Sequence, residues 1–416
     1  MRQQFVPTDW PLVALAALLT SFGIAMVYSA GQTDAPNFVA NLWKTQIMWA
    51  VIGVGIAWTM SRSSVRLLEF GALPVYLAAT FLLVLLLFIG QGAGTAASTK
   101  SWLAIGGVRI GQPSEFAKVA VVLMLARVLS AQRVAATTLF GLWRPTLIVG
   151  VPWLLIMAQP DLGTGLVFIG IYFAMLFWSG VSWPLLLMTA SPGVSLVLAF
   201  STGVWGAWFF LLLGLVAWKR PEWIEASVLI AANLFMGVAA PLLWDKLNPY
   251  QQRRLLVFLD PSSDPRASGY HLIQSQVAIG SGGFAGKGFT DGSQKRLAFL
   301  PEQHTDFIYA VVGEEFGFIG VSVVLAFFCV FLLRTVRIAG RASSPFASLS
   351  AFGLTAALLT HILVNVGMTI GLMPITGIPL PFFSYGGSFM MACWLSVGIL
   401  VLISAEGRGK ADGLVI

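Results

Sequence analysis

Long runs of apolar residues recur along the chain from Trp10 to Ile403. A helix that crosses a lipid bilayer needs about 20 mostly apolar residues, and this length is the template for assigning spans. The pattern predicts spans at residues 10–30, 44–61, 71–90, 114–131, 143–158, 162–180, 184–200, 206–218, 225–244, 305–333, 349–372 and 383–403. We therefore expect an all-α polytopic membrane protein with about 12 transmembrane helices.

Composition supports a lipid environment. Of the 416 residues, 57% are hydrophobic and only 10% are charged, whereas soluble domains carry about 25% charged residues. We expect one membrane domain over residues 1–416, without a soluble domain or a linker. The first apolar run lacks the pattern of a cleavable signal peptide, so it should remain as the first helix. Cys329 and Cys393 lie in apolar runs and are expected to be buried thiols.

Positive charges mark one side of the predicted spans. If the N-terminus is cytoplasmic, the short loops on that side contain Arg2, Arg62, Arg66, Arg127, Arg133, Arg144, Lys219, Arg220, Arg334, Arg337, Arg341, Arg408 and Lys410. This bias is the one expected of cytoplasmic loops. Both termini should then be cytoplasmic. The net charge of +7 is spread over short loops, so it does not indicate a nucleic-acid partner.

The segment 245–305 is predicted to lie outside the membrane as one long loop. A loop of this length without its own fold is usually functional. It contains Asp260 and Asp264, each followed by proline, and such pairs are common at turns. Beside fixed cations, a carboxylate there could also act as a general base for a sugar hydroxyl. Apolar residues at 270, 273 and 277 predict a short helix lying on the membrane surface.

Ionisable residues also occur inside predicted spans. In "GQPSEFAK", residues 111–118, Pro113 and Glu115 suit a helix start. Lys118 lies one turn further along, where it can face Glu115. Charged groups inside a span usually pair and face a cavity. A structural ion pair and a substrate site are both compatible with this spacing.

Other polar motifs stand at the ends of spans. Asp161 in "QPDLGTG", residues 159–165, is predicted to cap a helix. In "FLPEQHTDF", His304 could carry protons, whereas Thr305 and Asp306 could cap a helix and order the loop. Glu314 and Glu315 and the pair His361 and Asn365 should bind neighbouring helices together. Residues 373–388 break the apolar pattern, and irregular backbone at this depth must be buried or line a cavity.

Together these motifs resemble the SEDS family, the shape, elongation, division and sporulation proteins. The matching pieces occur in the family's order, and they are "QPSEFAK", "QPDLGTG", "DPRASGYHLIQSQVAIGSGG", "GKGF", "FLPEQHTDFIYAVVGEEFG" and "GIPLPFFSYGGS". The segments "FLDPSSDP" and "YHLIQSQVAIGSGG" are more similar to rod-shape members than to division members. The resemblance implies a core of about ten spans, so an inserted helical hairpin is predicted within about residues 184–225.

The resemblance also implies a function. The expected activity is a peptidoglycan glycosyltransferase that joins lipid II into β-1,4-linked glycan and releases undecaprenyl diphosphate at the outer face of the bacterial inner membrane, during cell elongation. Expected partners are the growing glycan strand, a class B penicillin-binding protein and other elongation-complex proteins. The family's essential aspartate corresponds to Asp264. Candidate substrate-binding residues are Arg109, Glu115, Lys118, Asp161, Arg266, Gln276, Lys287, His304, Asp306 and Ser384.

Asp264 is expected to accept the proton from the acceptor 4-hydroxyl, while Arg109, Lys118 and Arg266 hold the diphosphate. No metal motif is visible in the sequence, although a divalent cation such as Mg²⁺ or Mn²⁺ could assist, since Mg²⁺ commonly bridges phosphate oxygens. A lipid II flippase is the rival interpretation, because intramembrane charges and broken helices also suit transporters. A non-catalytic scaffold for cell-wall synthases is a third interpretation.

Overall fold

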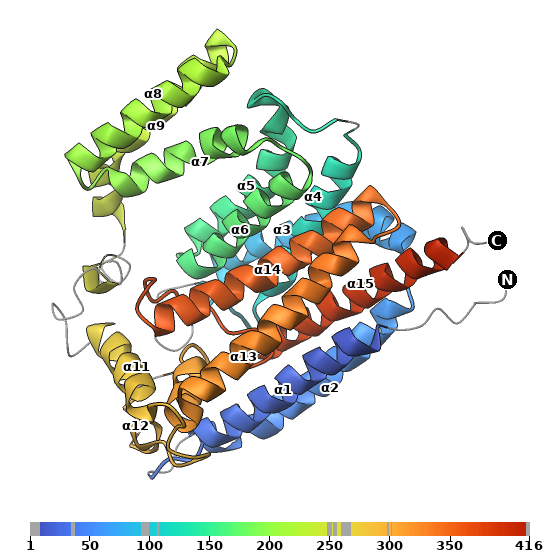
Figure 1. Ribbon diagram of the computed structural model, residues 1–416, viewed down its shortest axis with the longest axis vertical. Coiled ribbons are helices and arrows are strands. Elements are labelled where there is room, and N and C mark those ends of the chain that lie inside the picture. The colour runs from blue at the N-terminus through green and yellow to red at the C-terminus, as the bar shows by residue number, and fades with distance from the viewer. Residues whose placement is uncertain are drawn as a thin grey trace.

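Helices account for nearly all of the regular structure in the computed structural model (Figure 1). It describes residues 9–34, 38–92, 100–105, 108–132, 134–247, 252, 256–258, 268–297, 299–300 and 302–412. The long helices are α1 (Trp10–Ala30), α2 (Leu42–Ser61), α3 (Val65–Ile89), α4 (Pro113–Ser130), α5 (Trp143–Ala158), α6 (Leu162–Trp178), α7 (Trp183–Leu198), α8 (Thr202–Lys219), α9 (Trp223–Lys246), α13 (Ile308–Gly340), α14 (Pro345–Thr369) and α15 (Gly387–Asp412). Their positions confirm the predicted fold class.

Short elements connect these helices at the two ends of the bundle. They are η1 (Phe38–Asn41), η2 (Phe140–Leu142), α11 (Ser268–Gly282), α12 (Ser293–Arg296) and the antiparallel pair β1 (Leu103–Ile105) and β2 (Val108–Gly111). The α11 helix confirms the helix predicted around residues 270–277. Its buried face carries Leu272, Ser275 and Ala278 and packs on α13. Contact of its opposite side, which includes the exposed Val277, with a membrane surface stays a prediction.

The centre of the bundle is formed by α14 and α15. In their most apolar windows, 67% and 78% of the residues are buried, compared with 6% in α8. The α14 helix packs against α4, α6 and α13, and α15 packs along α2. The peripheral helices expose large apolar side chains such as Phe70 and Phe88, as lipid-facing helices should. Eight helices among the described residues are long and apolar enough to span a membrane, and α6 and α7 are shorter apolar helices.

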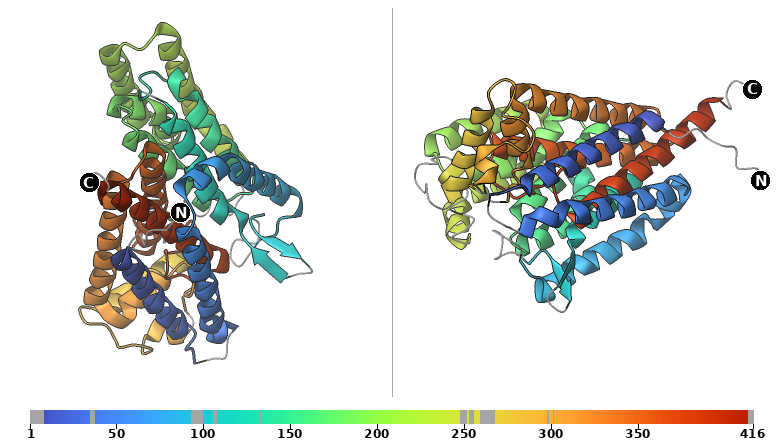
Figure 2. Two further views of the ribbon diagram at one scale, coloured as in Figure 1. Left: turned by 90° about the vertical axis from the view of Figure 1, so that its right-hand side faces the viewer. Right: turned by 90° about the horizontal axis from the view of Figure 1, so that it is seen from below.

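Helices α7, α8 and α9 extend from one side of the bundle (Figures 1 and 2). They have a small apolar cluster of their own, built from Met188, Leu212 and Leu229. Asn233 on α9 also bonds two serines of α7: it donates to Ser191 at 2.8 Å and accepts from Ser195 at 2.6 Å. The predicted insertion within 184–225 falls on α7 and α8, and its status as an insertion stays a prediction.

One expectation about the cysteines is wrong. Cys393 is buried as predicted, but Cys329 on α13 is exposed. An apolar run in a membrane protein faces either the protein core or lipid, and its composition does not distinguish the two. Cys329 lies on the exposed side of its helix.

Candidate functional site

Backbone contacts join several of the predicted motifs at the end of the bundle where α4, α6, α13 and α15 begin. The amide of Lys100 donates to the carbonyl of Gln159, and the amide of Tyr385 donates to the carbonyl of His304, both between segments far apart in the chain. The amide of Gln112 donates to the Ser388 hydroxyl at 3.0 Å. These bonds bring the motifs around residues 112, 159, 304 and 384 into one region.

A buried charged cluster lies one turn inside α4. The Lys118 ammonium is 2.6 Å from the Glu115 carboxylate and 2.7 Å from Nε2 of His361 on α14. All three side chains are buried. Nδ1 of His361 is 3.1 Å from the carbonyl of Pro379, so Nδ1 must carry the proton and Nε2 is left to accept from Lys118. The predicted pairing of Glu115 with Lys118 is therefore present, and His361 extends it to a second helix.

The cavity beside this cluster is small. It measures about 30 Å³ and is lined in part by Glu115, Lys118, His361 and Phe389. A volume of this size holds a water molecule or two. The Phe389 ring stacks on His361 at 4.7 Å between ring centroids and lies 5.5 Å from the Lys118 ammonium. The cluster is thus enclosed by aromatic and apolar groups and has little room for a sugar or a diphosphate.

Asp161 has the capping role predicted for it. One carboxylate oxygen accepts from the Thr164 amide at 3.0 Å at the start of α6. The other accepts from the Thr164 hydroxyl at 2.9 Å and from Ser101 and Gln112, each at 3.3 Å. The carboxylate therefore stabilises a helix start and also ties it to Ser101, just before β1, and to the residue that precedes α4.

The irregular segment between α14 and α15, residues 370–386, is the centre of a hydrogen-bond network. Ser384 accepts from the Leu380 amide at 2.7 Å and donates to the carbonyl of Thr305 at 2.6 Å. Gln46 on α2 donates to the Ser384 carbonyl at 2.9 Å and accepts from the Gly386 amide at 3.2 Å. These polar groups of the segment are satisfied within the protein, as irregular backbone in a bilayer requires.

The residues before α13 are held against this segment. Asn365 on α14 donates to the carbonyls of Asp306, at 2.9 Å, and Ile378, at 2.7 Å. His304 is buried beside the Tyr385 ring. Burial lowers the pKa of His304 below its ordinary value, although the negative charge of Glu302 opposes this shift.

Helix capping by Thr305 is not what the structure shows. Its hydroxyl bonds back to Glu302, and the residue that precedes α13 is Phe307, which offers no side-chain cap. The carbonyls of Thr305 and Asp306 instead accept bonds from Ser384 and Asn365. The loop-ordering role predicted for these residues is present, because their backbones anchor the loop to two other segments.

A second charged network lies between α1, α12 and α13. Lys287 pairs with Glu314 at 2.8 Å, and the completely buried Lys295 pairs with Glu315 at 2.5 Å. Ser29 on α1 donates to Glu315 at 2.5 Å, and its carbonyl accepts from Lys295 at 2.9 Å. Burial lowers the pKa of Lys295, and the Glu315 carboxylate opposes that shift. Lys287 therefore belongs to a different network from Lys118.

The remaining predicted site residues are placed only in part. Asp264 and Arg266 lie outside the described residues. The backbone of Arg109 is in β2, but its side chain also lies outside the described part. Gln276 is exposed on α11, and its amide donates to the carbonyl of Ile370 at 3.4 Å. Among the described residues, no group of three or more His, Cys, Asp and Glu side chains could hold a metal ion.

Sequence reasoning missed the buried Lys295–Glu315 pair and the contact of His361 with Lys118. A signal for His361 was available, because it is an ionisable residue in a predicted span and should have an ionisable or polar partner. Lys295 carried no such signal. It stands next to Arg296, whose guanidinium pairs with Asp34 and is half exposed, and the two residues look equivalent in the sequence.

Comparison with known proteins extends these observations. The profile of the FtsW/RodA/SpoVE family, described as cell cycle proteins, matches residues 9–212 and 201–409. The peptidoglycan glycosyltransferase RodA of Treponema pallidum (strain Nichols) is 33% identical over 429 residues, covering 96% of this chain and 98% of the relative. The peptidoglycan glycosyltransferase MrdB of Escherichia coli (strain K12) is 35% identical over 398 residues, covering 95% and 93%.

Solved structures show the same likeness. One belongs to a study of how a peptidoglycan synthase complex coordinates polymerization and crosslinking; its matching chain has a TM-score of 0.71 and 28% identity, with 97% of this chain and 99% of that chain covered. The crystal structure of the Thermus thermophilus rod shape determining protein RodA has a TM-score of 0.63 and 25% identity, with 96% and 97% covered.

Proposed function

The chain belongs to the FtsW/RodA/SpoVE family of cell cycle proteins, and on that premise we propose that it is a peptidoglycan glycosyltransferase of an elongating cell. It polymerises lipid II into β-1,4-linked glycan at the outer face of the inner membrane and releases undecaprenyl diphosphate. The similarity that carries this proposal spans 95% or more of the chain and includes relatives named as peptidoglycan glycosyltransferases. The SEDS motifs lie within that span.

Asp264 is proposed as the general base. It accepts the proton of the GlcNAc 4-hydroxyl of the acceptor lipid II as that oxygen attacks C1 of the MurNAc at the end of the growing chain. The diphosphate leaves from the opposite face, so the anomeric centre inverts. A free aspartate has a pKa of about 4 and is a weak base for this step. Stabilisation of the leaving diphosphate by Arg109 and Arg266 therefore has to lower much of the barrier.

The described contacts support a positioning role for Lys118. Its charge is neutralised by Glu115 at 2.6 Å, and its ammonium also contacts His361. Little charge remains for a diphosphate, and the cavity of about 30 Å³ does not admit one. Through His361 and the carbonyl of Pro379, the cluster connects α4 to the 370–386 segment. Lys118 thus acts by holding these elements in place.

Partners and any metal also belong to the proposal. A class B penicillin-binding protein that cross-links the new strands is the proposed partner, and the structural likeness to a peptidoglycan synthase complex supports it. A divalent cation that neutralises the diphosphate stays a prediction, and no step of the mechanism is derived through it. The chain is an integral membrane protein, and we propose that both of its termini face the cytoplasm.

Polymerisation of lipid II by the purified protein tests this function. We expect wild-type protein to form long glycan strands that a gel resolves and Asp264→Asn protein to form none, with at least about a hundredfold loss of rate, as general-base removal typically causes. Asp260→Asn is the matched control, because it changes the other Asp-Pro pair of the same loop. Normal polymerisation by folded Asp264→Asn protein contradicts the base assignment. Equal losses in both variants point to a loop-folding role.

A flippase is the second candidate, since α4 carries a charged pair inside a predicted span. The enclosure of that pair argues against a flippase, because a transporter with alternating access needs a cavity that accommodates the headgroup of lipid II. Translocation of fluorescent lipid II across vesicles, measured with the same purified protein, separates the two activities. Translocation without polymerisation supports the flippase.

A further inference from the structure

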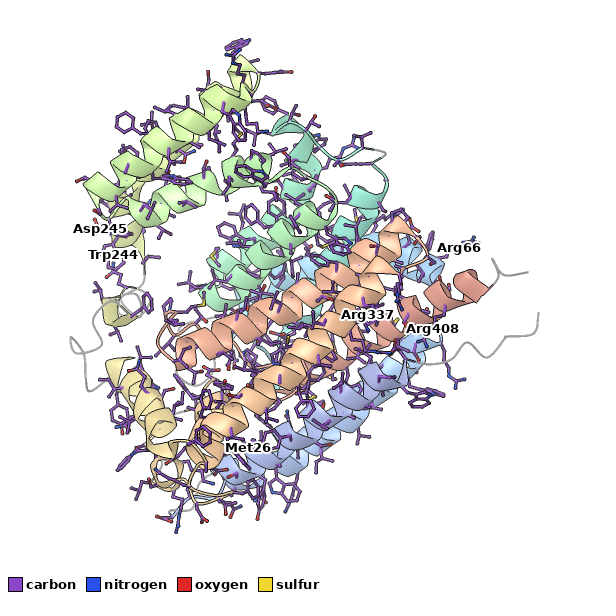
Figure 3. All side chains as sticks on the ribbon, viewed as in Figure 1. Met26, Arg66, Trp244, Asp245, Arg337 and Arg408 are labelled. Atoms are coloured by element: carbon purple, nitrogen blue, oxygen red, sulfur yellow. The ribbon has the colours of Figure 1, made fainter. Side chains whose placement is uncertain are left out.

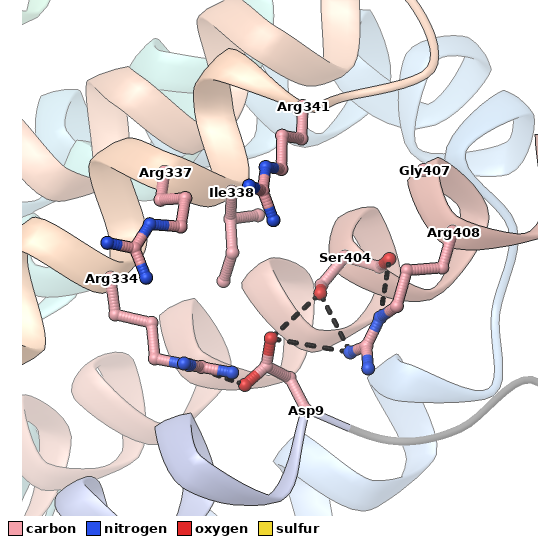
Figure 4. Close-up of a pocket in the computed structure, with 8 residues that line it drawn as sticks. All are labelled: Asp9, Arg334, Arg337, Ile338, Arg341, Ser404, Gly407 and Arg408. Carbon is pink, nitrogen blue, oxygen red and sulfur yellow. Dashed lines mark hydrogen bonds and ion pairs between the residues drawn. The ribbon is translucent and has the colours of Figure 1, made fainter. Parts of the chain in front are cut away.

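A large cavity lies at the end of the bundle opposite to α11 and α12 (Figures 1 and 4). Its volume is about 540 Å³, within the range of roughly 300–1,000 Å³ that small-molecule sites occupy. It lies between the start of α1 and the last turns of α13 and α15. The lining residues are Asp9, Arg334, Arg337, Ile338, Arg341, Ser404, Gly407 and Arg408.

The lining carries four guanidinium groups and one carboxylate. Both oxygens of Asp9 are already engaged. One accepts from Arg334 at 2.7 Å and from the Leu12 amide at 3.3 Å. The other accepts from Ser404 at 2.9 Å and from Arg408 at 3.3 Å. Burial alone would raise the pKa of Asp9, but the bonds from Arg334 and Ser404 keep it below the ordinary value, so the carboxylate is ionised at neutral pH.

Two of these arginines have no carboxylate partner among the described residues. Arg337 and Arg341 form no salt bridge with any residue in the described part of the chain. They lie four positions apart, with Arg337 in the last turn of α13 and Arg341 directly after its end, and Arg341 points into the cavity (Figure 4). The lining therefore has a net charge of +3, because four guanidinium groups face one carboxylate. Like charges that line one cavity repel one another, and an anion bound between them relieves this repulsion.

The exposed face of α13 indicates the kind of anion. Val323, Val330 and Arg337 are seven residues apart along the helix and so share one face, and Leu333 lies one turn before Arg337. Val323, Val330 and Leu333 are 47%, 51% and 61% exposed. An apolar stripe thus runs along the helix and ends at the unpaired arginines. This is the pattern expected for a molecule with acyl chains beside the stripe and an anionic group at its end.

We propose that this cavity binds the phosphate headgroup of an anionic glycerophospholipid, whose acyl chains lie along the exposed face of α13. Arginine forms bidentate bonds with phosphate, and basic pockets between helix ends on the cytoplasmic side are known to hold lipid headgroups. Arg66, Arg337 and Arg408 gather at this end of the molecule, whereas Trp244 and Asp245 lie at the other (Figure 3). A bound phosphate joins α13 to α15 and offsets their repulsion.

Native mass spectrometry of the delipidated protein in detergent tests the proposal. Phosphatidylglycerol is titrated against phosphatidylcholine with the same acyl chains. Wild-type protein should retain one phosphatidylglycerol with clear preference, and the double variant Arg337→Gln/Arg341→Gln should bind it roughly tenfold or more weakly. The double variant should fold, because neither side chain makes a described ion pair. Arg220→Gln is the matched control, because this exposed arginine lies at the predicted cytoplasmic end of α8 and does not line the cavity.

Thermal unfolding gives an independent readout. Phosphatidylglycerol should raise the Tm of wild-type and Arg220→Gln protein and leave that of the double variant unchanged, since a ligand stabilises the state that binds it. Equal lipid binding by wild-type and double-variant protein would overturn the site. An equal rise in Tm with glycerol 3-phosphate would show that the phosphate matters and the lipid does not. No glycan synthesis is involved, so these results are independent of the enzyme's activity.

Discussion

Lys118 carries its charge about one helical turn inside α4, where Glu115 and His361 enclose it. A charged group in a bilayer is stable only when it is paired or hydrated. The same rule describes Lys295, which is completely buried against Glu315. Removing one member of such a pair leaves the other as an uncompensated buried charge, which is more damaging than removing both.

Variants of the α4 pair therefore separate stability from activity. Lys118→Met should destabilise the protein by about 3–5 kcal/mol, because Glu115 is left buried without its partner. The double variant Glu115→Gln/Lys118→Met should recover most of that stability. Circular dichroism, recorded while the protein unfolds in detergent, measures the loss of stability. Lipid II turnover of the same samples measures activity.

The activity of the double variant is the informative result. If Lys118 positions α4 through His361, turnover should stay low although stability returns, because the bond to His361 is still missing. Full recovery of both would show that the pair serves folding alone. A stable single variant Lys118→Met would contradict the electrostatic argument itself.

The shifted pKa of Asp9 predicts how the stability of the protein depends on acidic pH. The pKa of its carboxyl in the folded protein lies below the ordinary value near 3.8. The folded state therefore binds fewer protons than the unfolded state in this range, and the stability from Asp9 is present above about pH 4 and lost as the pH falls further. Wild-type protein should be more stable than Asp9→Asn by about 1 kcal/mol at neutral pH.

That difference should begin to shrink below about pH 4 and approach zero once the pH falls below the lower pKa of Asp9 in the folded protein, because protonated Asp9 resembles asparagine. Denaturant unfolding at a series of pH values measures it. A difference that stays constant with pH would mean that the arginine pairing contributes nothing and that the substitution acts through packing.

At the scale of elements, the apolar pattern was enough to place the long helices. The spans expected at 10–30 and 143–158 correspond to Trp10–Ala30 and Trp143–Ala158, since the bilayer sets helix length. The apolar pattern alone does not show whether a residue faces lipid or the protein core, so it did not predict that Cys329 is exposed. Pairings across long sequence distances were also out of reach: Lys295 is buried only because α12 packs beside Ser29 of α1 and Glu315 of α13.

The kink in α13 explains the glycines in two of the sequence motifs, the end of "DPRASGYHLIQSQVAIGSGG" and "GKGF". At Gly317 the backbone leaves helical geometry, with φ 62° and ψ −158°. The carbonyls of Glu314 and Glu315 then accept from the amides of Lys287 and Gly288, and the amide of Phe318 donates to the carbonyl of Gly283. The segment after α11 thus replaces helical bonds that the kink removes, as buried backbone requires.

Gly317→Ala should consequently destabilise the protein. A Cβ there would lie 2.7 Å from the carbonyl carbon of Phe284 and would also clash with the amide of Gly286, and its φ is unfavourable for alanine. We expect a loss of about 2–4 kcal/mol in the free energy of unfolding. Gly55→Ala on α2 is the control, because nothing lies within 4 Å of the position that the added methyl group would take; it should be neutral or stabilising. A neutral Gly317→Ala variant would mean that the kink can shift along the helix.

At the scale of the whole molecule, the two ends of the bundle differ in their positive charge and in the sequence motifs that they carry. Arg66, Arg337 and Arg408, three of the predicted cytoplasmic arginines, lie at one end of the molecule, and α11 and α12 lie at the other (Figures 1 and 3). The hairpin of α7 and α8 enters and leaves on the arginine-rich side. It therefore leaves the orientation of all later helices unchanged, and with it the external position proposed for the loop that contains Asp264.

This orientation can be measured in cells. In protein with Cys329→Ser and Cys393→Ala, a cysteine at Ser201, in the turn between α7 and α8, should react with a membrane-impermeant maleimide added from outside. A cysteine at Arg220, after α8, should react only once the inner membrane is permeabilised. The positive-inside bias of Lys219 and Arg220 is the physical reason for this order. The opposite labelling would place the 245–305 loop in the cytoplasm, away from lipid II already translocated to the outer leaflet, and the proposed polymerase mechanism could not operate there.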